Sequence, residues 1–203
     1  MEKIWLKHYP PGVPAEIDVN EYESLRDIFE ESVSKYASRP AFTCMGKSIT
    51  FTELDTLSAA FGAWLQGIGG GKGTRVALMM PNILQYPVCL FGTLRAGGTV
   101  VNVNPLYTAR ELEHQLADSG AEVIVVLENF ASTLAEVIAK TKVRHVVVTS
   151  MGELMGVKGL VVNFVVRRVK KMVKPWSIPN AIHVSDALAE GRRRTLARVP
   201  LTH

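Results

Sequence analysis

The sequence has 203 residues, of which 47% are hydrophobic and 21% charged, and its formal net charge is +4; this is the ordinary balance of a soluble globular protein with one cored domain. The longest apolar runs, such as Val123–Leu127, are far too short to cross a bilayer, and the charges and prolines of residues 2–14 exclude a secretory signal peptide. A cytoplasmic location is the expectation that follows.

The chain opens with a proline-rich stretch, residues 1–23, which predicts an extended N-terminal segment. At Ser24 a helical pattern begins, and Asp27, three residues later, is placed to be its capping partner. From this point to residue 150 the pattern predicts an α/β subdomain.

A short β-hairpin and a second helix are expected next. The hairpin strands are predicted at Ala41–Met45 and Ser48–Phe51, around a Gly46–Lys47 turn. For the helix, the pattern predicts an N-cap at Thr52 with Asp55 as its partner, and an end at Gly67.

From residue 75 onward, strands and helices alternate. Strands are predicted at Arg75–Met80, Thr99–Val103, Val123–Leu127 and His145–Thr149, with a helix in each of the three intervals. The strands are continuous apolar runs, which is typical of parallel strands covered on both faces. The predicted fold class is therefore α/β, with a doubly wound, mostly parallel sheet flanked by helices.

Pro87 falls inside the helix predicted between Asn82 and Ala96. A proline in a helix interior removes one hydrogen bond and clashes with the preceding turn. Two alternatives follow: the helix starts late, with Pro87 in its first turn, or it is kinked at that residue.

Most of the positive charge lies at one end of the chain. Residues 1–157 carry 13 Lys and Arg against 17 Asp and Glu, whereas residues 158–203 carry 10 against 2. The 151–203 region is predicted to contain a basic helix over Val157–Lys174, one more strand near Ala181–Val184, and an irregular tail. Such an asymmetry indicates an anionic partner or a surface that is covered in a longer protein.

The Val157–Lys174 helix leaves three interpretations open: an ordinary helix that covers the sheet, a helix that lies on an anionic membrane surface, and a nucleic-acid contact. The tail lacks interleaved aromatic residues for base stacking, so nucleic acid is not expected as a partner. On a membrane, apolar side chains enter the headgroup region and cations meet phosphates. The predicted membrane contacts are Phe164, Arg167, Lys170, Lys171 and Lys174.

No catalytic, cofactor-binding or metal-binding residue can be assigned from spacing. The glycine-rich stretch Gly67–Thr74 fails as a phosphate loop because Gln66 and Gly73 stand where Gly and Ser or Thr are required. It also leaves a helix and enters a strand, whereas phosphate loops do the reverse. Cys44 and Cys89 lie among apolar neighbours and are expected to be buried free thiols.

Three stretches, in order, resemble the adenylate-forming superfamily of acyl-CoA synthetases and peptide-synthetase adenylation domains. They are Ile49–Leu54, then Leu94–Gly98 running into Val100–Pro105, and Thr108–Ser119. Further stretches are similar to bacterial long-chain fatty-acid–CoA ligases: Trp5–Leu6, Ala77–Asn82, Gln85–Pro87, Asn104–Thr108 and Val161–Lys174.

The resemblance implies the incomplete first subdomain of the adenylate-forming fold. It also implies ATP, Mg²⁺ and coenzyme A as cofactors and a fatty acid as substrate for the intact enzyme. The superfamily's nucleotide-binding loop is not found in this sequence, so the fragment is expected to be inactive and to bind none of these cofactors itself. Alternatives are a non-catalytic membrane-surface or dimerisation module, with a homodimer as partner, or a synthetase for another acid.

Overall fold

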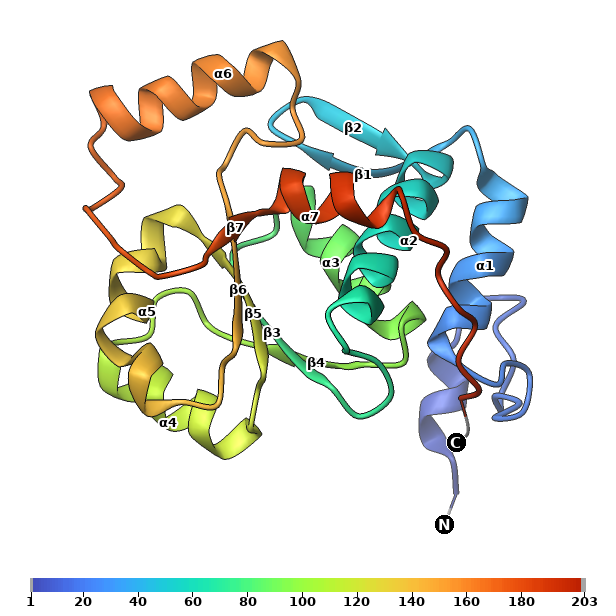
Figure 1. The fold of residues 1–203 in the computed structure, drawn as a ribbon. Coiled ribbons are helices and arrows are strands. Elements are labelled where there is room, and N and C mark those ends of the chain that lie inside the picture. The colour runs from blue at the N-terminus through green and yellow to red at the C-terminus, as the bar shows by residue number, and fades with distance from the viewer. Residues whose placement is uncertain (1, 202–203) are drawn as a thin grey trace.

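The computed structural model describes residues 2–201, which form a parallel sheet flanked by helices (Figure 1). The sheet strands are β3 (Arg75–Met79), β4 (Thr99–Asn102), β5 (Val123–Leu127), β6 (His145–Thr149) and β7 (Ile182–His183). Their order is β4-β3-β5-β6-β7, and every neighbouring pair is parallel. The predicted fold class and all four main strands are confirmed, and β7 is a two-residue form of the strand expected near 181–184.

Helices cover both faces of this sheet. On one face lie α2 (Phe51–Gly67), α3 (Gln85–Arg95) and α7 (Val184–Gly191); on the other lie α4 (Ala109–Ser119) and α5 (Ala131–Val137). Alternate residues of β5 enter opposite cores: Val123 and Val125 join the first cluster, Ile124 and Val126 the second. Because both faces are covered, β5 is buried throughout, as its unbroken apolar sequence predicts.

The hairpin packs beside the sheet as β1 (Pro40–Cys44) and β2 (Lys47–Thr50). Its turn is Met45–Gly46, one residue earlier than predicted. Both turn residues have positive φ, 49° and 75°, which is the backbone of a type I′ turn, and glycine adopts it without strain. Cys44 at the end of β1 is half-buried, so its predicted burial is wrong.

Helix α2 begins two residues earlier than predicted, and its N-cap is Thr50 rather than Thr52. The amide of Glu53 donates to Thr50 Oγ1 at 3.2 Å, and the Thr50 amide donates to Glu53 Oε2 at 2.7 Å. These bonds hold the pKa of the Glu53 carboxyl below its ordinary value. The other two predicted caps, Ser24 on α1 (Leu25–Tyr36) and Thr108 on α4, are confirmed.

Thr50→Ala is expected to destabilise the domain by about 1 kcal/mol at neutral pH, because an N-cap hydroxyl is lost. The lowered pKa of Glu53 means that its ionised form stabilises the fold above its unfolded pKa, near 4.5, and that this contribution is lost as pH falls through the lower folded pKa. The difference between wild type and Glu53→Gln should therefore shrink at acidic pH. Urea unfolding at several pH values measures both effects. Thr52→Ala is the comparison variant, since Thr52 Oγ1 donates to the Ala37 carbonyl at 3.0 Å and caps no helix. A loss of stability in Thr52→Ala with none in Thr50→Ala would contradict the observed cap.

Pro87 is the third residue of α3, which begins at Gln85. The late start is thus the alternative that the structure supports, because a proline in the first turn has no helical hydrogen bond to lose.

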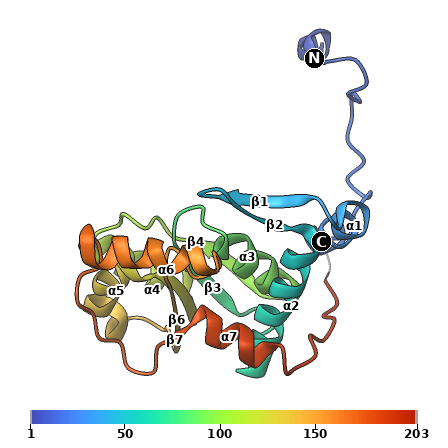
Figure 2. The ribbon, with the colours of Figure 1, turned by 90° about the horizontal axis from the view of Figure 1, so that it is seen from above.

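The two ends of the chain differ. Residues 4–8 form a short 3-10 helix, Ile4–His8, and the N-terminal segment runs away from the body (Figure 2). The irregular tail instead packs as a strap between α1 and α2 (Figure 1). Gln66 donates to the Ala197 carbonyl and accepts from its amide, while Arg198 forms ion pairs with Asp27 and Glu30. Four of the ten Lys and Arg beyond residue 157 therefore lie after α7, away from the 157–174 segment: Arg192, Arg193, Arg194 and Arg198.

Candidate functional site

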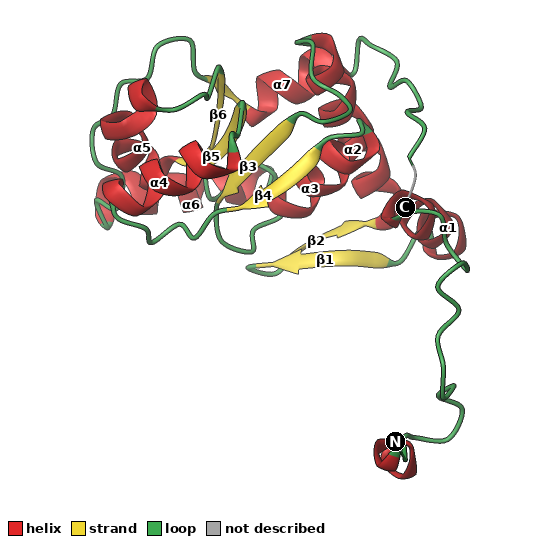
Figure 3. Cartoon of the chain, turned by 90° about the horizontal axis from the view of Figure 1, so that it is seen from below, coloured by secondary structure: helices red, strands yellow, loops and turns green. Residues whose placement is uncertain are grey.

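The carboxyl end of the sheet contains the topological switch point. From β3 the chain passes to β4 at one edge, then crosses to β5 on the other side of β3. In open α/β sheets, ligands bind outside the carboxyl ends of strands at such a point. Here that end is crossed by α6 (Val157–Phe164) and by the π-helical turn Val165–Val169 that continues it (Figures 1 and 3).

Polar side chains attach α6 to the ends of the strands. Asn163 accepts a hydrogen bond from the Gly152 amide at 2.8 Å and donates to Ser150 Oγ at 2.9 Å. Ser150 directly follows β6, and its carbonyl accepts a hydrogen bond from the buried Gln85 amide at 2.8 Å. One network thus links α6, β6 and α3, and because its members are buried or half-buried, an unpaired polar atom there would be costly.

An ion pair makes the second attachment. Glu128, immediately after β5, has a side chain only 5% exposed, and both of its oxygens accept from Arg167 Nε at 3.0 Å. A further contact, Arg167 Nη2 to Glu128 Oε2, measures 2.8 Å. Arg167 is therefore held toward Glu128, although 44% of its side chain stays exposed, and its predicted membrane contact stays a prediction.

A backbone contact sets how closely α6 approaches. Gly159 faces Gly152, and a Cβ atom built on Gly159 would lie 2.8 Å from the Gly152 carbonyl carbon. The atoms that a Cβ would meet belong to the backbone of Gly152 and cannot move aside as a flexible side chain could. Only glycine therefore fits at position 159.

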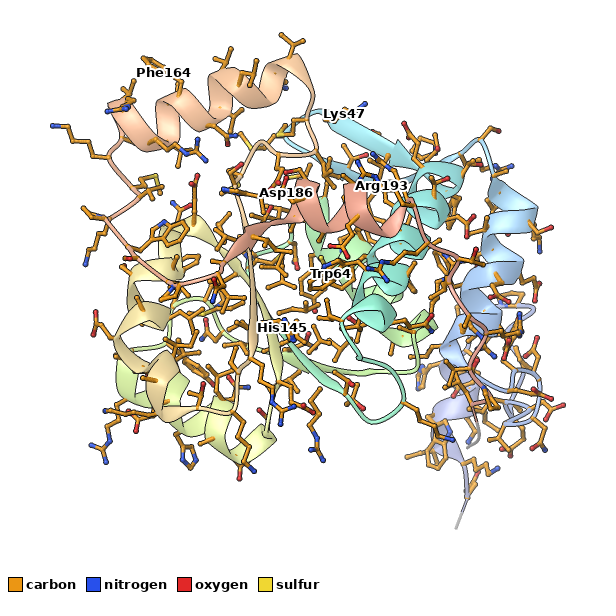
Figure 4. All side chains as sticks on the ribbon, in the orientation of Figure 1. Lys47, Trp64, His145, Phe164, Asp186 and Arg193 are labelled. Atoms are coloured by element: carbon orange, nitrogen blue, oxygen red, sulfur yellow. The ribbon has the colours of Figure 1, made fainter. Side chains whose placement is uncertain are left out.

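The inward face of α6 and of the turn that continues it is thus formed by Gly159, Val162, Asn163 and Arg167, and the outward face is apolar. The side chains of Val157, Leu160, Val161, Phe164 and Val169 are between 61% and 81% exposed. Phe164 projects from the outer side of the helix (Figure 4). The polar side of this amphipathic segment therefore faces the strand ends, and its apolar side faces outward. We call this set of five residues the outer apolar face.

The helical segment also ends earlier than the predicted Lys174. The Lys170 amide donates to the Val165 carbonyl at 2.8 Å, and Lys171 adopts a left-handed conformation with φ of 49° that turns the chain. From this turn to Trp176 the backbone is irregular. The predicted contacts Lys170, Lys171 and Lys174 lie in it or just before it, and all three are exposed.

Arg168 is not among the predicted membrane contacts, since on a helical wheel of residues 157–174 it falls on the apolar side. With that side turned outward, Arg168 is exposed beside the outer apolar face. Among residues 2–201, neither Arg168 nor Lys170, Lys171 and Lys174 forms an ion pair. We call these four residues the basic turn.

A shallow cavity of about 360 Å³ lies at the basic turn. Its walls are Arg167, Arg168, Val173, Lys174, Pro175 and Trp176. Cations and an indole around one open hollow can bind an anion that carries an apolar group.

The glycine-rich stretch Gly67–Thr74 does not have the position of a phosphate loop. Gly67–Thr74 connects the end of α2 to the start of β3, as predicted, and so lies at the amino end of the sheet. Its Thr74 hydroxyl accepts from the Gly71 amide at 3.0 Å, within the loop itself. Across residues 2–201, His, Cys, Asp and Glu form no group able to hold a metal ion. Burial raises the pKa of the Cys89 thiol far above its ordinary value, so this cysteine is inert.

Comparison with known proteins identifies the class. Residues 29–177 match the family of AMP-binding enzymes, and the chain belongs to that family. Solved structures agree on the fold. A long-chain-fatty-acid-CoA ligase from Archaeoglobus fulgidus is 23% identical with a TM-score of 0.67 over 94% of this chain, and an anthranilate CoA ligase has a TM-score of 0.68 over 90%. They confirm the expected N-terminal part of the adenylate-forming fold.

Within the family, the chain is most informatively compared with long-chain-fatty-acid–CoA ligases. It is 57% identical over 195 residues to the one from Yersinia pestis, 50% identical over 200 residues to that of Haemophilus influenzae, and 34% identical over 154 residues to that of Bacillus subtilis. These alignments cover 95%, 98% and 76% of this chain, respectively. The predicted resemblance is confirmed. The chain spans about a third of the length of these curated relatives, from 27% to 36%.

Proposed function

We propose that this chain is the N-terminal part of a long-chain fatty-acid–CoA ligase. The whole enzyme would convert a fatty acid and ATP into an acyl-adenylate and pyrophosphate, and then transfer the acyl group to coenzyme A. The observation that carries the proposal is the 57% identity that extends over 95% of the chain. Such identity over a continuous α/β subdomain supports a shared reaction more strongly than fold alone does.

The part that this chain plays is structural. Its sheet and its two layers of helices would form one wall of a larger enzyme, and no residue of the 2–201 range is assigned to the reacting atoms. ATP, Mg²⁺ and coenzyme A would be held by residues of the longer protein, since Gly67–Thr74 fits no phosphate. We therefore propose that the 203-residue chain alone does not catalyse the reaction.

ATP–pyrophosphate exchange in the presence of a long-chain fatty acid tests both statements. The 203-residue chain is expected to give no exchange above background, whereas a protein that continues this chain to the length of its relatives should give exchange that depends on the fatty acid. Exchange by the short chain would overturn its inactivity. A longer protein that exchanges only with an aryl or amino acid would overturn the long-chain assignment.

Two partners belong to the same proposal. A homodimer is one, and sedimentation velocity over a range of protein concentrations tests it. The other is the inner face of the plasma membrane, where long-chain fatty acids partition because each buried methylene gains roughly 0.8 kcal/mol. No helix among residues 2–201 has the length and apolar character needed to span a bilayer. A peripheral contact is therefore the kind that we propose.

A further inference from the structure

The outer apolar face of α6 is unusual because the helix turns its polar side inward. An amphipathic helix on a protein surface normally buries its apolar stripe against the core. Here the polar side chains Asn163 and Arg167 make the inward contacts, and five large apolar side chains point out. A continuous apolar patch of this kind marks a surface that binds another phase or molecule.

Charge around this face selects among the molecules that could cover it. Residues 154–185 contain six Lys and Arg and no Asp or Glu. Arg167 is neutralised by Glu128, and Lys158 donates to the Met45 carbonyl, which leaves the four cations of the basic turn without a partner among the described residues. A second copy of this chain would bring an identical cluster of positive charge to the contact, so two copies would repel each other there.

We propose that the outer apolar face and the basic turn together dock the protein onto an anionic phospholipid bilayer. Leu160, Val161 and Phe164 enter the boundary between headgroups and acyl chains. The basic turn contacts lipid phosphates, and Arg168 does so from the margin of the apolar face. This arrangement matches the two requirements of an interfacial helix, which are an apolar face and cations at its border.

The cavity beside the basic turn supports the choice of a lipid. Arg168 and Lys174 supply cations, and Trp176 supplies an amphipathic ring of the kind found at the level of lipid headgroups. A phosphodiester with an apolar tail fits this combination. A nucleic acid would use the cations but not the outer apolar face.

The attachment of α6 explains why its apolar side faces outward. The Gly159–Gly152 contact and the Arg167–Glu128 ion pair fix the rotation of the helix about its own axis. Turning the apolar face inward would bring bulky side chains against Gly152 and would leave Glu128 buried without its partner. The orientation is thus built into the fold and does not depend on a membrane being present.

This inference deepens the proposed function, because a bilayer is where long-chain fatty acids are found, but its test is independent of any ligase activity. The 203-residue chain is mixed with vesicles of phosphatidylcholine alone, or with vesicles in which phosphatidylglycerol replaces part of it, and binding is measured by co-sedimentation without nucleotide. Binding is expected to the anionic vesicles and to weaken strongly at high salt.

Two variants separate the contributions. Leu160→Asp with Phe164→Asp should weaken vesicle binding by roughly a hundredfold or more, because two apolar side chains no longer enter the lipid. Reversal of Lys170, Lys171 and Lys174 to Glu should reduce the affinity for anionic vesicles by at least a similar factor. Each lysine near the membrane surface raises the affinity about fivefold, and this gain is lost at all three positions. Both sites are exposed, so circular dichroism and urea unfolding should show an unchanged fold.

The matched controls carry the same chemistry elsewhere. Ile17→Asp with Leu106→Asp changes two exposed apolar side chains, and Lys72, Arg110 and Lys142 to Glu reverses three exposed cations, each with the same change in net charge as the corresponding variant. Both controls should bind vesicles like wild type. Absence of binding at low salt, or equal losses in variants and controls, would overturn the proposal. It would also be overturned by a Phe164-dependent dimer in place of vesicle binding, or by DNA binding without vesicle binding.

Discussion

Arg167→Met is expected to loosen α6 from the carboxyl end of the sheet and to cost about 3 kcal/mol in the stability of that attachment. The substitution leaves the Glu128 carboxylate, which is only 5% exposed, without its cation. Removing one partner of a buried ion pair typically costs 3–5 kcal/mol, since the remaining charge stays desolvated. The lower figure applies here because the Arg167 side chain is 44% exposed and water screens its half of the pair.

Part of this cost should appear as local opening rather than global unfolding. If α6 detaches, water reaches Glu128 and the penalty is relieved, so detachment is the cheapest response of the fold. Native-state proteolysis with trypsin should therefore cut within residues 158–170 at least about ten times faster than in wild type, since 1.4 kcal/mol already changes an opening equilibrium tenfold. Urea unfolding gives the global component.

Arg168→Met is the matched control for this prediction. The neighbouring arginine is exposed, forms no ion pair within residues 2–201, and its loss removes one trypsin site, as does the loss of Arg167. Its stability should stay within about 0.5 kcal/mol of wild type. The double variant Glu128→Gln with Arg167→Met should recover most of the loss. Identical behaviour of the two arginine variants would show that the ion pair does not hold α6.

The orientation of α6 is also the clearest example of what the sequence could not predict. A helical wheel separates the polar side chains Asn163 and Arg167 from the apolar ones, but it does not say which side meets the protein. The partners that decide this, Ser150 and Glu128, lie 13 and 39 residues away along the chain. Arg168 is absent from the predicted contacts for the same reason: an arginine among apolar residues is unfavourable on a face turned inward, but not on a face turned outward.

Other features were predictable because they depend on local interactions. The strands are marked by unbroken apolar runs, and Ser24 and Thr108 are marked by an acidic residue three positions later. At α2 this local rule was ambiguous, because Thr50 precedes Glu53 and Thr52 precedes Asp55 at the same spacing. Pairing of Thr50 with Pro40 in the hairpin places the end of β2 at Thr50, and thereby selects it as the cap.

Gly191→Ala is expected to destabilise the domain by about 2 kcal/mol, although alanine is the better helix former. Gly191 is the last residue of α7 and lies against α2, where a Cβ atom would be 2.7 Å from the Ala60 carbonyl carbon and 3.1 Å from the Trp64 amide nitrogen. Helix propensity favours alanine by about 1 kcal/mol. Overpacking costs up to about 3 kcal/mol here, because the atoms that the new Cβ would meet belong to the backbone of α2 and cannot move aside. The packing cost therefore outweighs the gain in helix propensity.

Urea unfolding of Gly191→Ala and of Gly71→Ala tests this balance. Gly71 is outside a helix, and a Cβ atom there would meet only the Ala96 carbonyl oxygen at 3.8 Å, an ordinary contact. Its substitution should leave stability within about 0.5 kcal/mol of wild type or raise it slightly, because alanine restricts the unfolded chain. A stabilised Gly191→Ala would mean that α7 can move off α2. The strap that follows α7, held by Gln66 and packed through Leu196 against Gly62, would then not be fixed by the position of this helix.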